Sequence, residues 1–349
     1  MDRINKRGTN KLTKESELTK HRREHSAIAL FSGGLDSILA VKWMKELGYE
    51  VFPLFFAAPY LPPQKALASA EENDIEIDVI DITQAHLQMI QAPLHGFGKH
   101  HNPCVDCHAL MFRIAGSLLE QYGASFLISG EVLGQRPMSQ RRSALHSVAN
   151  TSGVGDLLVR PLSQKLLPDT KPLREGWVEK EDLLAIHGRG RNAQFDLAQQ
   201  LGIKSYPPPG GGCLLTDRNF TLRLRDLIEH KLENPYDIEL LRWGRHFRLS
   251  PTLKLIVGRD EADNANLDLA AGKADKMLIR DVMGPLGVLT GAPPDEDTLA
   301  LACSILLAYS RKAPDPGYVR YRIDSIDERE ILVSKADSDT LSKYKISYD

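Results

Sequence analysis

The sequence predicts an α/β protein, with a doubly wound parallel sheet followed by a second, smaller α+β domain. From Ser26 onward, short apolar runs alternate with segments of helical periodicity, which is typical of a parallel sheet with crossover helices. The first apolar run leads into a glycine-rich turn and then a helix, the usual place for a ligand-binding loop in such sheets. The 349 residues are long enough for two domains of about 150 residues each.

The first domain is expected to contain five strands. Each apolar run is short and is bounded by glycine or polar residues, which fits buried strands of a parallel sheet. The helix after the first strand repeats apolar residues every three or four positions and ends at Gly48. The predicted strands are Ala27–Phe31, Val51–Phe56, Ile75–Ile82, Ser125–Gly130 and Leu157–Leu162, and the predicted helices are Asp36–Leu47, Gln64–Asn73, Cys107–Tyr122 and Asn192–Gly202.

The pattern changes in the last third of the chain. Tyr206–Cys213 is too rich in proline and glycine for a regular element. Beyond it we predict strands at Leu253–Gly258, Met277–Val282 and Gly287–Gly291 and a helix at Glu296–Arg311. We therefore expect a basic arm at 1–25, a first domain at 26–228 and a second domain at 236–349. We interpret the arm as a solvated tail, with contact to RNA as the less favoured alternative.

Composition excludes several classes of protein. Lys and Arg number 44 against 46 Asp and Glu, so the chain is not a globally basic nucleic-acid binder, although local basic faces are allowed. No apolar run reaches the roughly 18 residues that a membrane-spanning helix needs. The first residues lack the apolar core of a secretory signal, and four cysteines do not make a disulfide scaffold. We expect a cytoplasmic protein with no membrane contact.

The sharpest motif is SGGLDS, at Ser32–Ser37, between the first strand and the first helix. Gly33 and Gly34 allow a tight turn whose N–H groups point at an anion, and Ser32 and Ser37 add hydroxyl donors at the positive end of the helix dipole. This arrangement suits a phosphate or pyrophosphate. It lacks the Gly-Lys-Ser/Thr of a Walker A loop and the G-x-G-x-x-G of a dinucleotide fold.

This loop resembles that of the ATP-pyrophosphatase (PP-loop) superfamily. Enzymes of that superfamily cleave ATP between the α and β phosphates and adenylate a carbonyl or carboxyl oxygen. The resemblance implies that Asp36 helps to orient Mg²⁺ and the triphosphate. It also implies an adenine nucleotide α-hydrolase-like fold for the first domain.

Three cysteines form the second signal. Cys104 and Cys107 stand in NPCVDCH as a C-x-x-C that we place near a helix N-terminus, where the dipole lowers a thiol pKa and suits a nucleophile or a metal ligand. Cys213 follows a run of glycines, and Cys303 fits an apolar helix face as a core residue. Histidines surround the C-x-x-C, and we interpret them as solvated rather than as zinc ligands: His95, His100, His101 and His108.

The PP-loop together with the three cysteines resembles the tRNA thiolation enzymes, over roughly Ser26–Asp217. The NPCVDC segment is similar to that of bacterial tRNA 2-thiouridylases. The set Cys104, Cys107 and Cys213 resembles that of iron–sulfur-dependent tRNA thiolases, which implies a [4Fe–4S] cluster with one open iron that carries sulfide. The part after Leu241 is similar to the RNA-binding domain of the NFACT proteins.

Further contacts are expected after the fourth strand. Gly130 would allow adenine or ribose to approach the backbone, and Gln135 and Arg136 could reach phosphates. The predicted RNA contacts are Arg141, Arg142, Arg242, Arg245 and Arg248. Trp243 and Phe247 are placed either as stacking faces for bases or, with equal weight, in the core. The basic turn His187–Asn192 is read either as a further contact or as an exposed turn.

These observations predict an ATP-dependent tRNA sulfurtransferase that gives 4-thiouridine or 2-thiouridine. The three cysteines favour a [4Fe–4S] cluster as the sulfur carrier. A cysteine persulfide, with zinc or no metal, is the alternative. The expected partners are tRNA, a sulfur donor (sulfide or a cysteine desulfurase) and, as an open question, a second copy in a homodimer. The competing functions are sulfur transfer to a small molecule, an adenylating ligase and a pure RNA-binding module.

Overall fold

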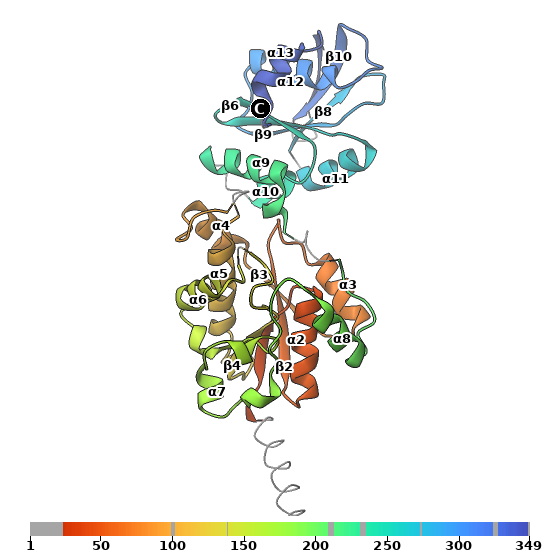
Figure 1. Cartoon of the computed structure of the whole chain (residues 1–349). Coiled ribbons are helices and arrows are strands. Elements are labelled where there is room, and N and C mark those ends of the chain that lie inside the picture. The colour runs from red at the N-terminus through yellow and green to blue at the C-terminus, as the bar shows by residue number, and fades with distance from the viewer. Residues whose placement is uncertain are drawn as a thin grey trace, which may run out of the picture. The chain divides into compact units, whose positions relative to one another are not determined.

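The computed structural model describes residues 24–98, 102–137, 139–208, 213–230, 235–272, 274–323 and 327–347. The chain divides into two compact units, Met1–Gly212 and Cys213–Asp349 (Figure 1). The division lies before the boundary predicted at 228, because helix α9 (Arg218–Glu229) belongs to the second unit. The predicted basic arm lies, except for its last two residues, outside the described residues.

The first unit is built on a five-stranded sheet with the order β3-β2-β1-β4-β5. Its strands are β1 (Ala27–Leu30), β2 (Val51–Ala57), β3 (Asp78–Asp81), β4 (Phe126–Ser129) and β5 (Leu158–Val159). Every strand pair is parallel, and Ala27 of β1 aligns with Val51 of β2 and with Phe126 of β4. The chain moves outward from β1 in one direction and then restarts on its other side. The predicted doubly wound sheet is confirmed, and its switch point lies between β1 and β4.

Helices cover both faces of this sheet, with α2 and α3 on one face and α5 and α6 on the other (Figure 1). Helix α2 is buried on nearly all sides: Ile38 and Val41 pack on the sheet, and Leu39 packs toward α8. Burial of each such side chain stabilises the fold by about 1.5–3 kcal/mol. The helices are α2 (Leu35–Glu46), α3 (Gln64–Glu72), α4 (Thr83–Gln91), α5 (Cys104–Ser117), α6 (Arg142–Ser152), α7 (Lys171–Arg174) and α8 (Asn192–Gln200).

Two elements near the cysteines differ from the prediction. Strand β3 pairs with β2 only over Asp78–Asp81, because it is the edge strand and the rest of the predicted run lies beyond the ladder. Helix α5 begins at Cys104 instead of Cys107, directly after Pro103, a residue without a backbone N–H to leave unpaired at a helix start. Both cysteines of the C-x-x-C therefore lie in the first turn of a helix.

The second unit contains a six-stranded antiparallel sheet with the order β11-β10-β8-β9-β7-β6. Helix α12 (Glu296–Ala308) packs on one face with Leu255 of β7, and α11 (Glu261–Ala271) packs on the opposite face with Ile256 of the same strand. The strands are β6 (Arg245–Ser250), β7 (Leu253–Val257), β8 (Asp275–Ile279), β9 (Gly287–Gly291), β10 (Gly317–Ile323) and β11 (Asp327–Val333), and the remaining helices are α9, α10 (Pro235–Leu240) and α13 (Ser338–Tyr344).

The α+β class of this unit is confirmed, and the sequence located β7, β8, β9 and α12. Strands β6, β10 and β11 were not predicted, although in β10 the apolar Val319 and Tyr321 alternate with Arg320 and Arg322 as in a half-buried strand. Four helices of this unit share a start signal that the sequence shows directly, an aspartate whose carboxylate accepts a hydrogen bond from the N–H three residues on. These caps are Asp217, Asp260, Asp295 and Asp337. Within the described residues, no helix has the length and apolar character needed to cross a membrane.

Candidate functional site

The SGGLDS motif forms a loop between β1 and α2 at the switch point of the first sheet. Gly33 has a φ of +75°, which favours glycine, and the first helical hydrogen bonds run from Ser37 N–H and Ile38 N–H to Gly34 O. The N–H groups of Leu35 and Asp36 precede these bonds, so they are available to an anion at the positive end of the helix dipole. The loop therefore has the tight turn that was predicted, and its binding of pyrophosphate stays a prediction.

The two serines of the motif connect the ends of the loop. Ser37 Oγ donates to Gly34 O at 2.8 Å and lies 3.2 Å from Ser32 Oγ. Gly33 is fixed from outside, because Ser69 Oγ on α3 donates to its carbonyl at 2.8 Å. Ser32 itself is exposed. Of the two predicted hydroxyl donors, Ser32 is thus placed to meet a ligand, and Ser37 shapes the loop.

Asp36 lies in the first turn of α2 with most of its side chain covered. Burial raises the pKa of this carboxyl above its usual range, although Gln135 and the arginines Arg191 and Arg136 act in the opposite direction. Gln135 Nε2 donates to Oδ2 at 2.5 Å, whereas Arg191 Nη2 lies 3.8 Å from Oδ1. Oδ1 is buried and has no hydrogen-bond partner within the described residues. A carboxylate oxygen that makes no hydrogen bond is suited to a hard cation such as Mg²⁺.

Two residues that hold Asp36 were not predicted as site residues. Gln194 on α8 donates through Nε2 to Gln135 Oε1 at 2.6 Å and thereby orients the amide that meets Asp36. Arg191 precedes α8, in the basic turn that the sequence analysis left open between a contact and an exposed turn. Its side chain is only 15% exposed and pairs with Asp36, so this part of the turn packs against the SGGLDS loop (Ser32–Ser37), which we call the nucleotide loop after its predicted role. Gln194 carries no signal in the sequence that would have identified it.

Gly130, directly after β4, must be a glycine for a different reason from the approach of adenine or ribose that we predicted. A Cβ added there would lie 2.4 Å from the carbonyl carbon and oxygen of Asp36 and 2.6 Å from Ser37 N. The space that we reserved for adenine or ribose is occupied by the first turn of α2. Gly130 is therefore needed for the close approach between β4 and the nucleotide loop, which sets the position of Asp36.

Cys104 is half-buried at the start of α5. Burial raises the pKa of its thiol, although Asn102 and Arg136 act to lower it. The expectation that the helix dipole lowers this pKa is wrong for Cys104, because loss of solvent outweighs the nearby positive charge. Asn102 Nδ2 lies 3.1 Å from Sγ. The positive charge of the exposed Arg136 acts to lower the pKa of both the Cys104 thiol and the Asp36 carboxyl.

Cys107 has a different environment from Cys104. It is buried, and its Sγ lies 3.2 Å from Nε2 of His86, a fully buried residue of α4. The hydroxyl of Tyr60 is hydrogen-bonded to Nδ1 of the same imidazole. Neither Tyr60 nor His86 was predicted, because a lone histidine or tyrosine on an apolar face gives no signal in the sequence.

The histidines around the C-x-x-C serve as structural partners where they are described. Asp106 accepts from the backbone N–H of His95 at 3.0 Å and lies 3.1 Å from its Nδ1. His108 Nδ1 lies 3.0 Å from the buried Glu131. Burial opposes ionisation of Glu131, but Arg160 and His108 outweigh it and hold its pKa at about 2. The predicted His100 and His101 lie outside the described residues.

The third predicted cysteine, Cys213, is the first residue of the second unit. Thiolates are the ligands that iron–sulfur clusters use, so the donor type fits. Within the described residues, however, no group of three or more His, Cys, Asp or Glu side chains gathers in a metal-binding arrangement. Cys303 is fully buried on α12, as predicted for a core residue. The four cysteines form no disulfide.

The predicted basic face of the second unit is largely paired. Arg248 donates to both carboxylate oxygens of Asp226, at 3.1 and 2.5 Å, and only 13% of its side chain is exposed. Lys254 is fully buried 3.8 Å from the same carboxylate, and burial lowers its pKa to about 7. Residues 242–259 contain no acidic residue, but folding brings Asp226 of α9 against Arg248 and Lys254. Arg248 is therefore not an accessible RNA contact.

The two aromatic residues near these arginines, Trp243 and Phe247, differ in their burial. Phe247 is fully buried in the core under α12, so its assignment as a base-stacking face is wrong, whereas Trp243 is half-buried beside Arg242. Arg242 pairs with Glu239 at 2.7 Å, and Arg245 lies 4.7 Å above the ring of Tyr309. In the first unit, Arg141 and Arg142 are both exposed at the start of α6.

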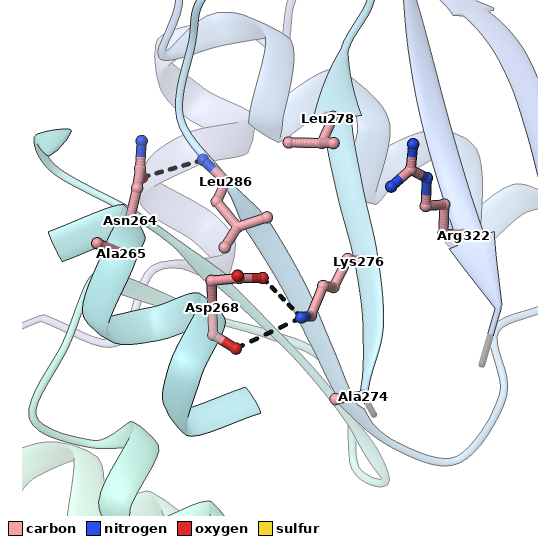
Figure 2. Close-up of a pocket in the computed structure, with 8 residues that line it drawn as sticks. All are labelled: Asn264, Ala265, Asp268, Ala274, Lys276, Leu278, Leu286 and Arg322. Carbon is pink, nitrogen blue, oxygen red and sulfur yellow. Dashed lines mark hydrogen bonds and ion pairs between the residues drawn. The ribbon is translucent and has the colours of Figure 1, made fainter. Parts of the chain in front are cut away.

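A hollow of about 550 Å³ lies in the second unit between α11 and the face of the sheet (Figure 2). Lys276 of β8 pairs with Asp268 of α11 at 2.6 Å across it, and Arg322 of β10 flanks it. Its floor is apolar, and its lining consists of Asn264, Ala265, Asp268, Ala274, Lys276, Leu278, Leu286 and Arg322. The sequence analysis did not anticipate this hollow, whose residues come from four separate segments.

Two family models match the chain. Residues 23–164 match the model described as thiamine biosynthesis protein (ThiI), and residues 244–345 match the model described as NFACT protein RNA binding domain. No curated protein sequence matches the chain. Together the two models cover the nucleotide loop, the C-x-x-C and most of the second unit.

Three solved structures are similar to parts of this chain at low sequence identity. The C-terminal part of a fibronectin/fibrinogen-binding protein from Streptococcus suis is 13% identical, with 45% of this chain and 79% of that chain covered and a TM-score of 0.27. A predicted subunit of tRNA methyltransferase from Methanocaldococcus jannaschii is 21% identical, with coverage of 39% and 68% and a TM-score of 0.30. A 4-thiouridine synthetase in complex with RNA and bound ATP is 19% identical, with a TM-score of 0.33, and this chain spans 50% of its length.

Proposed function

We propose that this chain, which joins a ThiI-type region to an NFACT-type RNA-binding region, is an ATP-dependent tRNA sulfurtransferase. It acts on a uridine and gives 4-thiouridine or 2-thiouridine. The observation that carries the proposal is the joint position of two reactive groups in one unit. The nucleotide loop presents Asp36 Oδ1, which makes no hydrogen bond within the described residues and only a 3.8 Å ion pair with Arg191, and the thiol of Cys104 is half-buried at the start of α5 in the same unit.

The chemistry explains why a thiolase needs both groups. A uracil carbonyl oxygen is a poor leaving group, and attachment of AMP turns it into a phosphate ester that leaves readily. In the first step the carbonyl oxygen attacks the α-phosphorus of ATP, and pyrophosphate leaves. In the second step sulfur attacks the activated carbon, and AMP leaves with the former uridine oxygen. The products are the thionucleoside, AMP and pyrophosphate.

The nucleotide loop would hold the triphosphate in the first step. The N–H groups of Leu35 and Asp36 and the exposed hydroxyl of Ser32 would donate to phosphate oxygens. Asp36 is the residue that would hold Mg²⁺, which would offset the negative charge of the pyrophosphate. Gln135 and Arg191 keep the carboxylate of Asp36 in place, and Gly130 allows α2 to approach the end of β4.

The cysteines would supply the sulfur. If a [4Fe–4S] cluster is present, Cys104, Cys107 and Cys213 would be its protein ligands, and the cluster would supply sulfur at the sulfide level. In the persulfide alternative, one cysteine carries S–SH, whose outer sulfur attacks the activated carbon. A second cysteine then attacks the inner sulfur and forms a disulfide, which an external thiol must reduce before the next turnover.

The second unit would bind the tRNA. Its match to an RNA-binding domain supports this assignment. On β10, Arg320 and Arg322 are exposed and pair with Glu330 and Glu328, so RNA phosphates would have to replace these carboxylates as partners. In the first unit, Arg141 and Arg142 are exposed. Arginine contacts to phosphate would make the affinity for tRNA fall with increasing salt.

The test is mass spectrometry of tRNA nucleosides from cells that lack the gene, compared with the parent and with complemented strains. We expect loss of one thionucleoside, rescue by the wild-type gene, and no rescue by Asp36→Asn or Cys104→Ser. A purified enzyme should form AMP from ATP only when tRNA is present. Persistence of every thionucleoside, together with tRNA-independent AMP formation, would refute the proposal.

Sulfur transfer to a small molecule is the second candidate function, because the matching family model is described by thiamine biosynthesis. It requires the same loop and thiols, Cys213 included, but gives the RNA-binding region 244–345 no role. Deletion of that region would then leave AMP formation intact in a small-molecule assay. Under the tRNA proposal the same deletion abolishes tRNA-dependent AMP formation, provided that the remaining part is shown to be folded by circular dichroism.

A further inference from the structure

The two thiols of the C-x-x-C lie in the same helical turn but have different partners. Cys104 is half-buried and receives a hydrogen bond from the Asn102 amide at 3.1 Å. Cys107 is buried, and its sulfur meets the imidazole of His86 at 3.2 Å. An incoming reagent therefore reaches Cys104 first, and Cys107 is the inner thiol.

Two buried polar side chains, those of Tyr60 and His86, connect to Cys107 through consecutive hydrogen bonds. Tyr60 follows β2, His86 lies on α4, and both side chains are fully buried. The Tyr60 hydroxyl is hydrogen-bonded to His86 Nδ1, and His86 Nε2 faces the sulfur. Buried polar groups cost stability unless each is satisfied, and apolar residues would fill the same space without that requirement.

The direction of these hydrogen bonds depends on the tautomer of the imidazole. In a neutral ring one nitrogen carries the N–H and donates, and the other accepts. With the proton on Nε2, Tyr60 donates to Nδ1 and Nε2–H donates to the Cys107 sulfur, and in the other tautomer both hydrogen bonds reverse.

We infer that His86 and Tyr60 are positioning residues for the Cys107 sulfur, and that they favour the dithiol form of the Cys104–Cys107 pair over its disulfide. This inference rests on the proposed function, in which these thiols handle sulfur. A thiolate or thiol sulfur hydrogen-bonds to the imidazole, whereas a disulfide sulfur is a much weaker partner. Oxidation of the pair therefore loses this hydrogen bond, whichever way it points.

The experiment measures the thiol–disulfide equilibrium of the metal-free, reduced full-length chain in glutathione buffers. Two thiols of the chain pass two electrons and two protons to glutathione disulfide, which yields the Cys104–Cys107 disulfide and two molecules of reduced glutathione. Free thiols are alkylated after acid quenching, and mass spectrometry of the peptide that holds both cysteines gives the oxidised fraction.

We expect His86→Leu to shift this equilibrium about tenfold toward the disulfide, which corresponds to about 30 mV. Tyr60→Phe keeps the ring volume and should shift it in the same direction by about threefold. His86→Gln retains an N–H donor and should give an intermediate value. His108→Gln is the matched control, because His108 is adjacent to Cys107 in sequence but contacts Glu131, and it should leave the equilibrium unchanged.

An unchanged thiol–disulfide equilibrium in folded Tyr60→Phe and His86→Leu would overturn the inference. Tyr60 and His86 would then be structural residues of the core. If His86→Leu does not fold, the Tyr60→Phe result decides. Absence of the disulfide from the wild-type chain in every buffer would also overturn it. Since the measurement needs neither ATP nor tRNA, failure of the proposed function would appear separately, as persistence of all thionucleosides in the gene deletion.

Discussion

Substitution of Gly130 by alanine tests whether the end of β4 sets the nucleotide loop. The added Cβ would lie 2.4 Å from the backbone carbon and oxygen of Asp36, and an ordinary contact begins at 3.4 Å. The neighbours are backbone atoms of a helix that is buried on nearly all sides, so rotation of a side chain cannot relieve the overlap. Helix α2 and β4 must therefore separate by about 1 Å, the difference between these two distances.

This displacement has two measurable consequences. Overpacking of this kind costs about 1–3 kcal/mol of unfolding free energy. For a unit of this size, the melting temperature should fall by roughly 2–12 °C. Because Asp36 moves with the first turn of α2, tRNA-dependent AMP formation should fall about 100-fold, the effect expected of a misplacement of about 1 Å.

The assay combines differential scanning fluorimetry with chromatographic measurement of AMP for the wild type, Gly130→Ala and a control. Gly190→Ala is the control, since a Cβ at Gly190 meets nothing within 4 Å, and it should resemble the wild type in melting temperature. Wild-type stability and AMP formation in Gly130→Ala would refute the argument that this glycine is required by the fold.

Three further substitutions test buried groups. Glu131→Gln should lower the unfolding free energy by about 3–5 kcal/mol at pH 7, because Arg160 loses its charged partner. Since its pKa is held at about 2, the wild type should lose that contribution as the pH falls below 4.5, and urea unfolding of wild type and variant should converge toward acid pH. Lys254→Met should flatten the pH dependence of stability between pH 7 and 10, where the folded chain binds fewer protons at this lysine than the unfolded chain and wild-type stability therefore rises with pH. An equal slope in both proteins would contradict the burial of this ammonium group. Phe247→Ala should cost about 3–5 kcal/mol in urea unfolding of the second unit, whereas a loss below 1 kcal/mol would place the ring on the surface after all.

The nucleotide loop was predictable because its function depends on neighbours in sequence. Gly33 must turn with positive φ, Ser37 must reach back to Gly34, and both requirements are met within six residues. The same holds for the parallel sheet, whose buried strands appear as short apolar runs. The aspartate caps of the second unit are also local signals.

The roles of the partners of Asp36 and Cys107 were decided by the tertiary structure. Gln135 and Gln194 come from segments 59 positions apart, and Tyr60, His86 and Cys107 come from three separate elements. None of these residues has a local pattern, since a single polar side chain in an apolar segment is equally compatible with a surface or a core position.

The basic segment after Leu241 shows the limit of local reasoning most clearly. The sequence determined its charge and its two aromatic rings, and from these we predicted an RNA-binding face. Folding buried Phe247 under α12 and brought Asp226 from α9 to Arg248 and Lys254. Sequence thus determined the parallel sheet, the turn at Ser32–Ser37 and the cysteine motif, because their signals are local. Burial and long-range pairing determined which charges, rings and thiols remain accessible, because both depend on residues distant in the chain.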